Sequence, residues 1–137
     1  MFYKRLCGYD ALAIELQTNA GLVFIRPIHL GGTQMIKVSV MYPSSEGSTF
    51  DMAYYCNKHI PMVRQKFGAA LKGVAVEQGL AGGQPDAPPP FVAMGHLLFD
   101  SVEAFQAAFA PIAPALMSDI PNYTNIQPTI QIGEVKI

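Results

Sequence analysis

The residues best suited to chemistry are a phenol and an imidazole one helical turn apart. They lie in the segment FDMAYYCNKHIPMVRQKFG, residues 50–68, where Tyr55 precedes His59 by four positions. Side chains at this spacing share one side of a helix, so both can face the same ligand. An imidazole exchanges protons near neutral pH, which suits His59 to act as a general acid or base. Tyr55 would then orient or polarise a substrate oxygen.

A packing role for His59 is equally open. Pro61 has no N–H, so the carbonyl of Asn57 loses its helical partner and the helix is expected to bend there. A tyrosine and a histidine beside a bend make a suitable polar lining for a small-molecule pocket. A histidine at the border of a helix can also be a hydrogen-bonded packing residue. The residue types alone do not choose between the two.

Two further candidates lie outside this segment. His96 alternates with Met94 and Leu98 in an apolar strand, where it either lines a cavity or bonds a backbone group at a sheet edge. Tyr123, in PNYTN, is either a lid over a pocket mouth or an ordinary loop aromatic. His29 lies in a segment without a clear pattern and is discounted. The three histidines lack supporting Cys or carboxylate spacing, so no metal site is expected.

The helix that carries Tyr55 and His59 is expected to start at a capping box of Ser48 and Asp51 and to end at Gly68. Placed at about 100° per residue, five side chains form an arc that faces the sheet: Met52, Cys56, Ile60, Val63 and Phe67. Tyr55 and His59 fall on the border of this arc, and Tyr54 falls on the solvent side. Since Cys56 lies on the buried arc, we do not expect it to be a reactive thiolate.

Strand and helix patterns alternate from residue 35 onward. Strands are expected at residues 36–42, 71–80, 91–100 and 129–137. One helix follows the first strand, and a second starts at Asp100 or Ser101 and is limited by Pro111 and Pro114. Residues 81–90 are expected to form an extended polyproline segment, and residues 118–128 an irregular crossing. The order β-α-β-β-α-β predicts an α+β, ferredoxin-like fold, in which two helices cover one face of a four-stranded antiparallel sheet.

The strand at 91–100 is apolar on both of its faces. One face carries Val92, Met94 and Leu98, and the other carries Ala93, Leu97 and Phe99. A sheet face that is apolar but has no helix over it is expected to be covered by another surface. Two such sheets packed face to face would form a dimeric α/β barrel. We therefore expect a homodimer.

The composition limits the kinds of partner. Hydrophobic residues make up 50% of the chain and charged residues 14%, which indicates apolar area covered by self-association or lining a cavity. A net charge of −1 without a basic cluster argues against nucleic acid and anionic membranes as partners. Cys7 and Cys56 show no metal or disulfide spacing and indicate reduced thiols. No apolar run approaches the roughly 20 residues that span a bilayer, so we expect a soluble, cytoplasmic protein.

The first 34 residues differ from the rest of the chain. They show no clean hydrophobic period, whereas Met35 opens a clear strand pattern. Residues 1–34 are an N-terminal extension that is either a genuine arm or upstream sequence read from an early start codon. For the second interpretation, the codons of Gly31 and Gly32 would stand where a ribosome-binding site is needed. The domain itself is expected at residues 35–137.

Several motifs in this order resemble the EthD family. They are YY followed by H-x-P at Tyr54, Tyr55, His59 and Pro61, then GLAGG with PPP, HLLFDS and IPNYT. The resemblance covers Met35 to Val135. The family is named for a gene that accompanies a cytochrome P450 system degrading ethyl tert-butyl ether. The resemblance implies a dimeric α+β barrel but no settled activity; relatives of this barrel include cofactor-free monooxygenases, muconolactone isomerases and polyketide cyclases.

Together the residues and the resemblance predict a small-molecule-binding protein of the EthD type. It would be a cofactor-independent enzyme or an accessory factor in the degradation of ethers, aromatics or related apolar compounds. The expected site has His59 and Tyr55 as catalytic residues and Tyr54, His96 and Tyr123 as substrate-binding residues. Neither a metal nor an organic cofactor is expected. The alternative is a non-catalytic ligand-binding or partner protein that assists an oxygenase.

Overall fold

The structure is a computed structural model that describes residues 3–4, 13–18, 21–24 and 34–137. The chain divides into two compact units, Met1–Thr33 and Gln34–Ile137. The first unit contains antiparallel strands in the order β1-β2-β3, namely β1 (Tyr3–Lys4), β2 (Ala13–Thr18) and β3 (Gly21–Phe24). Both interpretations of residues 1–34 stay predictions, and His29 lies outside the described residues.

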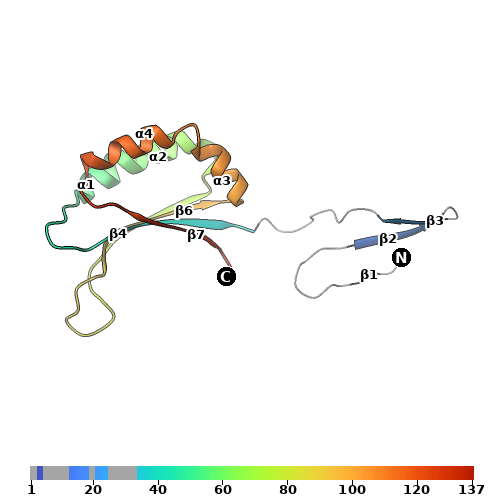
Figure 1. The fold of residues 1–137 in the computed structure, drawn as a ribbon, viewed down its shortest axis with the longest axis horizontal. Coiled ribbons are helices and arrows are strands. Elements are labelled where there is room, and N and C mark those ends of the chain that lie inside the picture. Colours follow the sequence, from blue (N-terminus) through green and yellow to red (C-terminus); the bar gives the residue numbers. More distant parts are fainter. Residues whose placement is uncertain (1–2, 5–12, 19–20, 25–33) are drawn as a thin grey trace. The chain divides into compact units, whose positions relative to one another are not determined.

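A four-stranded antiparallel sheet with the order β5-β6-β4-β7 forms the base of the second unit (Figure 1). The strands are β4 (Ile36–Pro43), β5 (Gly73–Gln78), β6 (Phe91–Phe99) and β7 (Thr129–Glu134). β4 and β6 are central because their alternating apolar residues bury one complete face. The order of elements confirms the predicted α+β, ferredoxin-like fold.

The helices of this unit cover one face of the sheet (Figure 1). Between β4 and β5 run α1 (Met52–Tyr54), the π-helical turn η1 (Tyr55–His59), α2 (Ile60–Phe67) and the 3-10 turn η2 (Gly68–Ala70). Between β6 and β7 run α3 (Val102–Phe109), α4 (Ala113–Asp119) and the 3-10 turn η3 (Ile120–Asn122).

Three predictions about these helices need correction. The irregular crossing predicted for residues 118–128 is wrong at its start, because helical structure continues to Asn122. Pro114 does not end the helical region; it lies in the first turn of α4, where the missing N–H of proline costs no hydrogen bond. The capping box is also wrong, because Asp51 is the residue that caps α1, accepting a hydrogen bond from the N–H of Tyr54 at 2.9 Å.

The hydrophobic core lies between the helices and the sheet. Its larger cluster joins β4 and β6 to the helices: Ile36, Val38, Val63, Phe67, Leu97, Phe99, Phe105 and Leu116. A second, aromatic cluster surrounds the π-helical turn: Tyr42, Tyr55, Ile60, Ala93, Tyr123 and Ile126. On β6 the alternate residues Met94 and Leu98 lie on the sheet face away from these clusters and are only half-buried, whereas Val92 at the start of the strand packs against the aromatic cluster.

The connection between β5 and β6 projects away from the helical layer (Figure 1). Its backbone turns back on itself, with hydrogen bonds from Gly82 N to Ala87 O (2.8 Å) and from Ala87 N to Gln84 O (3.1 Å). Asp86 adopts a left-handed conformation with φ of 60° within this turn. The prediction of an extended polyproline segment for residues 81–90 is therefore wrong in its middle, although the prolines that follow do lead straight into β6.

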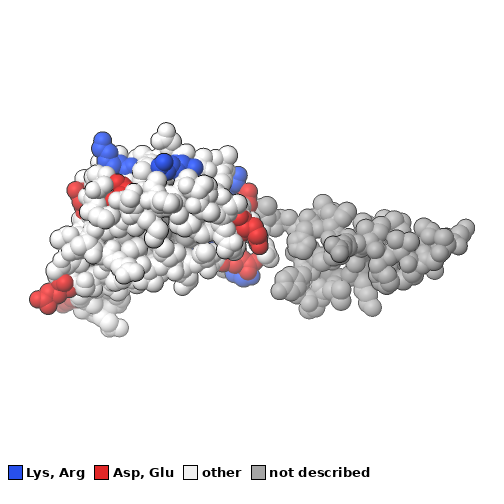
Figure 2. Space-filling view, turned by 45° about the horizontal axis from the view of Figure 1, so that its top comes forward, with Lys and Arg blue, Asp and Glu red and all other residues white. Residues whose placement is uncertain are grey.

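Charged side chains are sparse on the surface of the second unit. Basic residues gather on the outer side of the helical layer (Figure 2), where Lys58, Arg64 and Lys66 are exposed. Most of the remaining surface in this view carries no charged residue, as expected from the low charged fraction. Within the described ranges, no helix combines the length and the apolar character that crossing a membrane requires.

Candidate functional site

The π-helical turn brings Tyr55 and His59 into the protein interior. The N–H of Ile60 bonds the carbonyl of Tyr55 instead of that of Cys56, so the turn contains one extra residue. This turn directly precedes Pro61, which has no N–H to continue the regular ladder. The extra residue rotates the preceding side chains by about 100° relative to those that follow. As a result Tyr55 and His59 are only 2% and 7% exposed.

The same rotation corrects the predicted helix arc. Cys56, predicted to face the sheet, is exposed to solvent. Tyr55, predicted on the border, takes its place against β6, with its hydroxyl over the Cα of Gly95. A Cβ at position 95 would overlap that hydroxyl, so a glycine is needed for this close approach. The ring of Tyr55 stacks on that of His59, with centroids 5.5 Å apart and planes 14° apart.

His59 forms a close pair with Asp119, the last residue of α4. Nδ1 of His59 lies 2.7 Å from Oδ2 of Asp119, and both side chains are largely buried. Asp119 was not among the predicted site residues, because residues 118–128 were expected to form an irregular crossing. In the sequence, Asp119 stands directly before the IPNYT motif, but this position does not indicate that it contacts His59.

Asp119 also accepts two hydrogen bonds on its other oxygen. The Tyr54 hydroxyl donates to Oδ1 at 2.8 Å and the Asn122 amide donates to Oδ1 at 2.9 Å. Burial alone raises the pKa of Asp119, but the hydrogen bonds from Asn122, His59 and Tyr54 outweigh it and hold the pKa below its ordinary value. The hydrogen bond to this carboxylate in turn raises the pKa of Tyr54. Asp119 is thus an ionised acceptor at neutral pH.

Tyr123 lies on the other side of the imidazole. Its hydroxyl is 3.5 Å from Nε2 of His59 and 2.7 Å from the hydroxyl of Tyr42. Burial raises the pKa of Tyr42, Tyr55 and Tyr123, so all three phenols stay protonated and serve as hydrogen-bond donors or acceptors without charge. Tyr123 is 3% exposed, so in this structure it is part of the aromatic cluster.

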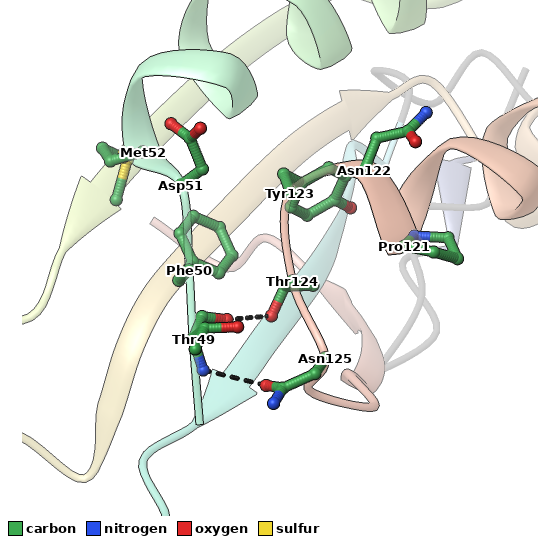
Figure 3. A pocket seen from close by; sticks show the side chains of 9 residues that line it. All are labelled: Thr49, Phe50, Asp51, Met52, Pro121, Asn122, Tyr123, Thr124 and Asn125. Carbon is green, nitrogen blue, oxygen red and sulfur yellow. Dashed lines mark hydrogen bonds between the residues drawn. The ribbon is translucent and has the colours of Figure 1, made fainter. Parts of the chain in front are cut away.

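A surface hollow of about 590 Å³ adjoins this group (Figure 3). The residues around it come from the segment that leads into α1 and from the segment around η3: Thr49, Phe50, Asp51, Met52, Pro121, Asn122, Tyr123, Thr124 and Asn125. The two segments are joined by hydrogen bonds from Thr124 Oγ1 to Thr49 O (2.7 Å) and from Thr49 N to Asn125 Oδ1 (2.8 Å). Tyr123 and Asn122 line the hollow and also contact the His59–Asp119 pair, so the two features share a wall.

A model of the EthD domain matches residues 47–127, more than half of the chain. The chain belongs to the EthD domain family. The matched range contains His59, Asp119, Tyr54, Tyr55 and Tyr123. No significant match to this chain was found among curated proteins.

Solved structures agree with this family assignment. An EthD-like protein from Ralstonia eutropha JMP134 shares 50% identity over 77% of this chain and 95% of its own, with a TM-score of 0.74. An ethyl tert-butyl ether (EthD) family protein from Bacillus halodurans C-125 shares 23% identity over 74% of this chain and 98% of its own, with a TM-score of 0.52. A dimeric protein of ferredoxin-like fold from Bacteroides fragilis NCTC 9343 shares 11% identity over 74% of this chain and 97% of its own, with a TM-score of 0.50. The last two comparisons support the fold alone.

The EthD domain holds His96 far from this group, on the sheet face that the helices do not cover. Its Nδ1 lies 3.0 Å from Ser39 Oγ and its Nε2 lies 2.7 Å from Glu77 Oε1. The partners of His96 are therefore two side chains on neighbouring strands and not a backbone group. Of the predicted site residues, Tyr54, Tyr55, His59 and Tyr123 come together within one protomer, and His96 does not join them.

The described part of the EthD domain contains no group of three His, Cys, Asp or Glu side chains that could hold a metal ion. Both members of the His59–Asp119 pair are groups that can accept or release a proton themselves. An ionised carboxylate on Nδ1 favours the neutral tautomer that donates from Nδ1 and leaves Nε2 as the acceptor. The pair has the geometry of a general base with its orienting carboxylate.

Proposed function

We propose that this EthD domain binds a small molecule and moves a proton at His59. The observation that carries the proposal is the 2.7 Å contact between Asp119 Oδ2 and His59 Nδ1, which leaves Nε2 directed at Tyr123. In the base step, Nε2 takes a proton from the ligand, and the imidazolium is stabilised by Asp119. In the acid step, the same nitrogen returns the proton to the product. Both steps use only groups of this chain, so the proposal requires no cofactor.

Tyr123 is the residue that a ligand has to displace. Its hydroxyl is 3.5 Å from Nε2, a long contact that a ligand oxygen or carbon acid would replace. Tyr123 also lines the surface hollow, so rotation of its side chain would connect the hollow to the imidazole. The displaced phenol would stay protonated at neutral pH, since an ordinary tyrosine has a pKa of about 10, and it could donate a hydrogen bond to a developing oxyanion.

The aromatic surroundings favour an apolar or aromatic ligand. Phe50, Tyr55 and Tyr123 pack edge to face or at a tilt, with ring centroids 5.0–5.5 Å apart. A ligand that replaced one of these contacts would meet aromatic faces on the remaining sides. Ethers, phenols and related degradation intermediates fit this environment. An EthD family protein from Bacillus halodurans C-125, whose family is named for ethyl tert-butyl ether, has the same fold. These residues all lie in the unit Gln34–Ile137, which we propose is the functional domain.

A ligand screen on the full chain tests this proposal. Aromatic lactones, phenols and tertiary alcohols would be added to the wild type and to His59→Gln, with melting temperature and turnover as readouts. We expect a compound that stabilises both proteins but is converted only by the wild type. Conversion at an equal rate by His59→Gln would contradict the role of His59.

The second candidate is a non-catalytic ligand-binding or partner protein that assists an oxygenase. It is favoured by the burial of His59, which is 7% exposed and packs against the ring of Tyr123 with ring centroids 4.7 Å apart. In that case the surface hollow would be the binding site and the imidazole a packing residue. A compound that binds both proteins with equal affinity, and that neither protein converts, would support this candidate.

We also propose that a second copy of the chain covers the open sheet face and forms a dimeric α/β barrel. Met94 and Leu98 on this face are half-buried in a single protomer, although they are apolar. A protein of the same fold from Bacteroides fragilis NCTC 9343 is dimeric. The mass of the full chain in solution, measured by light scattering, should be that of two copies; the mass of one copy would exclude the barrel.

A further inference from the structure

Tyr54 and Asn122 contact Asp119 at the carboxylate oxygen that does not face His59. Both donate to Oδ1 of Asp119, at 2.8 and 2.9 Å, whereas Oδ2 is left for His59. The three residues come from different elements, since Tyr54 ends α1, Asn122 ends η3 and Asp119 ends α4. The carboxylate is therefore held from two directions.

This arrangement controls which way the carboxylate is turned. The torsion about the Cβ–Cγ bond of an aspartate is broad, so a carboxylate with a single partner can turn its oxygens out of line with that partner. Two donors on Oδ1 oppose that rotation, because turning the group would break both charge-assisted hydrogen bonds. With the orientation held, Oδ2 accepts from Nδ1 of His59, and Nε2 keeps its lone pair for a ligand.

The side chain of Tyr54 packs on one aromatic neighbour and directs its hydroxyl at Asp119. Its ring stacks on Tyr123, with centroids 6.3 Å apart and planes 23° apart, and its hydroxyl points inward to Asp119. Asn122 is exposed and lines the surface hollow, but its amide nitrogen is likewise directed at Asp119. Neither group donates to His59 directly.

We infer that Tyr54 and Asn122 are positioning residues, which hold Asp119 so that His59 carries its proton on Nδ1. Tyr54 then acts through Asp119 and is not the substrate-binding residue expected from its place in the YY motif. The inference rests on the proposed function for its catalytic meaning. The tautomer of His59 can nevertheless be measured without any substrate.

The test is nitrogen NMR of the histidine rings in the full chain at about pH 8, where an ordinary imidazole is neutral. The variant Tyr54→Phe removes only the hydroxyl and keeps the stacked ring. Tyr55→Phe is the matched control, because it removes a neighbouring phenol hydroxyl that does not contact Asp119. His59→Gln assigns the His59 signals, and His96 on the other sheet face serves as an internal reference.

We expect wild-type His59 to be mainly in the Nδ1–H form. In Tyr54→Phe the minor Nε2–H form should rise roughly tenfold, which corresponds to the loss of one hydrogen bond to a charged group. Tyr55→Phe and the His96 signals should be unchanged. Asn122→Leu should act in the same direction as Tyr54→Phe, and it keeps the test available if Tyr54→Phe does not fold.

The positioning role and the proposed function would be contradicted by different results. An unchanged His59 tautomer in both Tyr54→Phe and Asn122→Leu would overturn the positioning role and leave the proposed function intact. A wild-type His59 that carries its proton on Nε2 would contradict the proposed function itself, because the base would then face Asp119 instead of a ligand.

Discussion

The imidazole of His59 and the carboxylate of Asp119 are 60 residues apart in the sequence and 2.7 Å apart in the structure. The pair links the turn before α2 to the end of α4 and lies under the aromatic cluster. Its two polar groups are therefore part of the packing as well as the proposed site. Substitutions in this pair can therefore change both the stability of the fold and the proposed proton transfer.

Replacing Asp119 by Asn should lower stability. The amide cannot match an ionised acceptor toward three donors, so we expect a loss of about 1–3 kcal/mol in the free energy of unfolding, measured in urea. Asp100→Asn is the control, since its 3.6 Å ion pair with Lys72 is largely exposed and should contribute little. Equal losses in the two variants would show that Asp119 contributes no more to the free energy of unfolding than a solvent-accessible carboxylate does.

The contribution of Asp119 to the free energy of unfolding should disappear at low pH. Although burial opposes it, hydrogen bonding holds the pKa of Asp119 below its ordinary value in the folded protein. The carboxylate therefore stabilises the fold above the unfolded-state pKa of about 4, and this contribution is lost as the pH falls through the folded pKa. The stability difference between wild type and Asp119→Asn should be constant from about pH 6 to 5 and shrink below about pH 4. The same comparison in a His59→Gln background removes the imidazole partner, and a difference that persisted at low pH would contradict the assignment.

Tyr42 and Tyr123 should behave as a coupled pair. Their hydroxyls are 2.7 Å apart and buried, so removing one leaves the other without its partner, at a cost of about 1–3 kcal/mol. The double variant Tyr42→Phe with Tyr123→Phe should cost less than the sum of the two single variants. Urea denaturation of the four proteins measures this coupling, and strict additivity would rule it out.

Gly95→Ala should be destabilising in a way that a second substitution relieves. The new Cβ would overlap the Tyr55 hydroxyl, and we expect a loss of about 1–3 kcal/mol from overpacking. Tyr55→Phe removes the overlapping atom, so the double variant should be more stable than Gly95→Ala alone. If Tyr55→Phe gave no relief, strain in the strand backbone would be the better explanation.

Met94→Glu should separate the proposed dimer. The carboxylate would lie on the open sheet face, where covering by a second copy would bury it without a partner. We expect the mass in solution to fall from two copies to one. Met117→Glu is the control on the helical layer, because Met117 is 62% exposed and lies away from that face. A dimer that survived Met94→Glu would place the interface elsewhere.

The sequence alone was sufficient for the fold class and for most of the elements. Alternation of apolar residues in Ile36–Pro43 and Phe91–Phe99 is a local property, and it predicts both the strands and the sheet face that they bury. The IPNYT and YY…H-x-P motifs predicted membership of the EthD family, and the match to the family model confirmed it. The segment holding Tyr54, Tyr55 and His59 was likewise identified from residue types and spacing.

Only the tertiary structure decided how these residues meet. A helical wheel assumes one constant angle per residue, so the π-helical turn before Pro61 exchanged the predicted places of Tyr55 and Cys56. Asp119 acquired its role because the packing of α4 carries it to the imidazole, and no local pattern encodes that distance. His96 was separated from His59 because the helices cover the other face of the sheet, and which face they cover is a property of the packing.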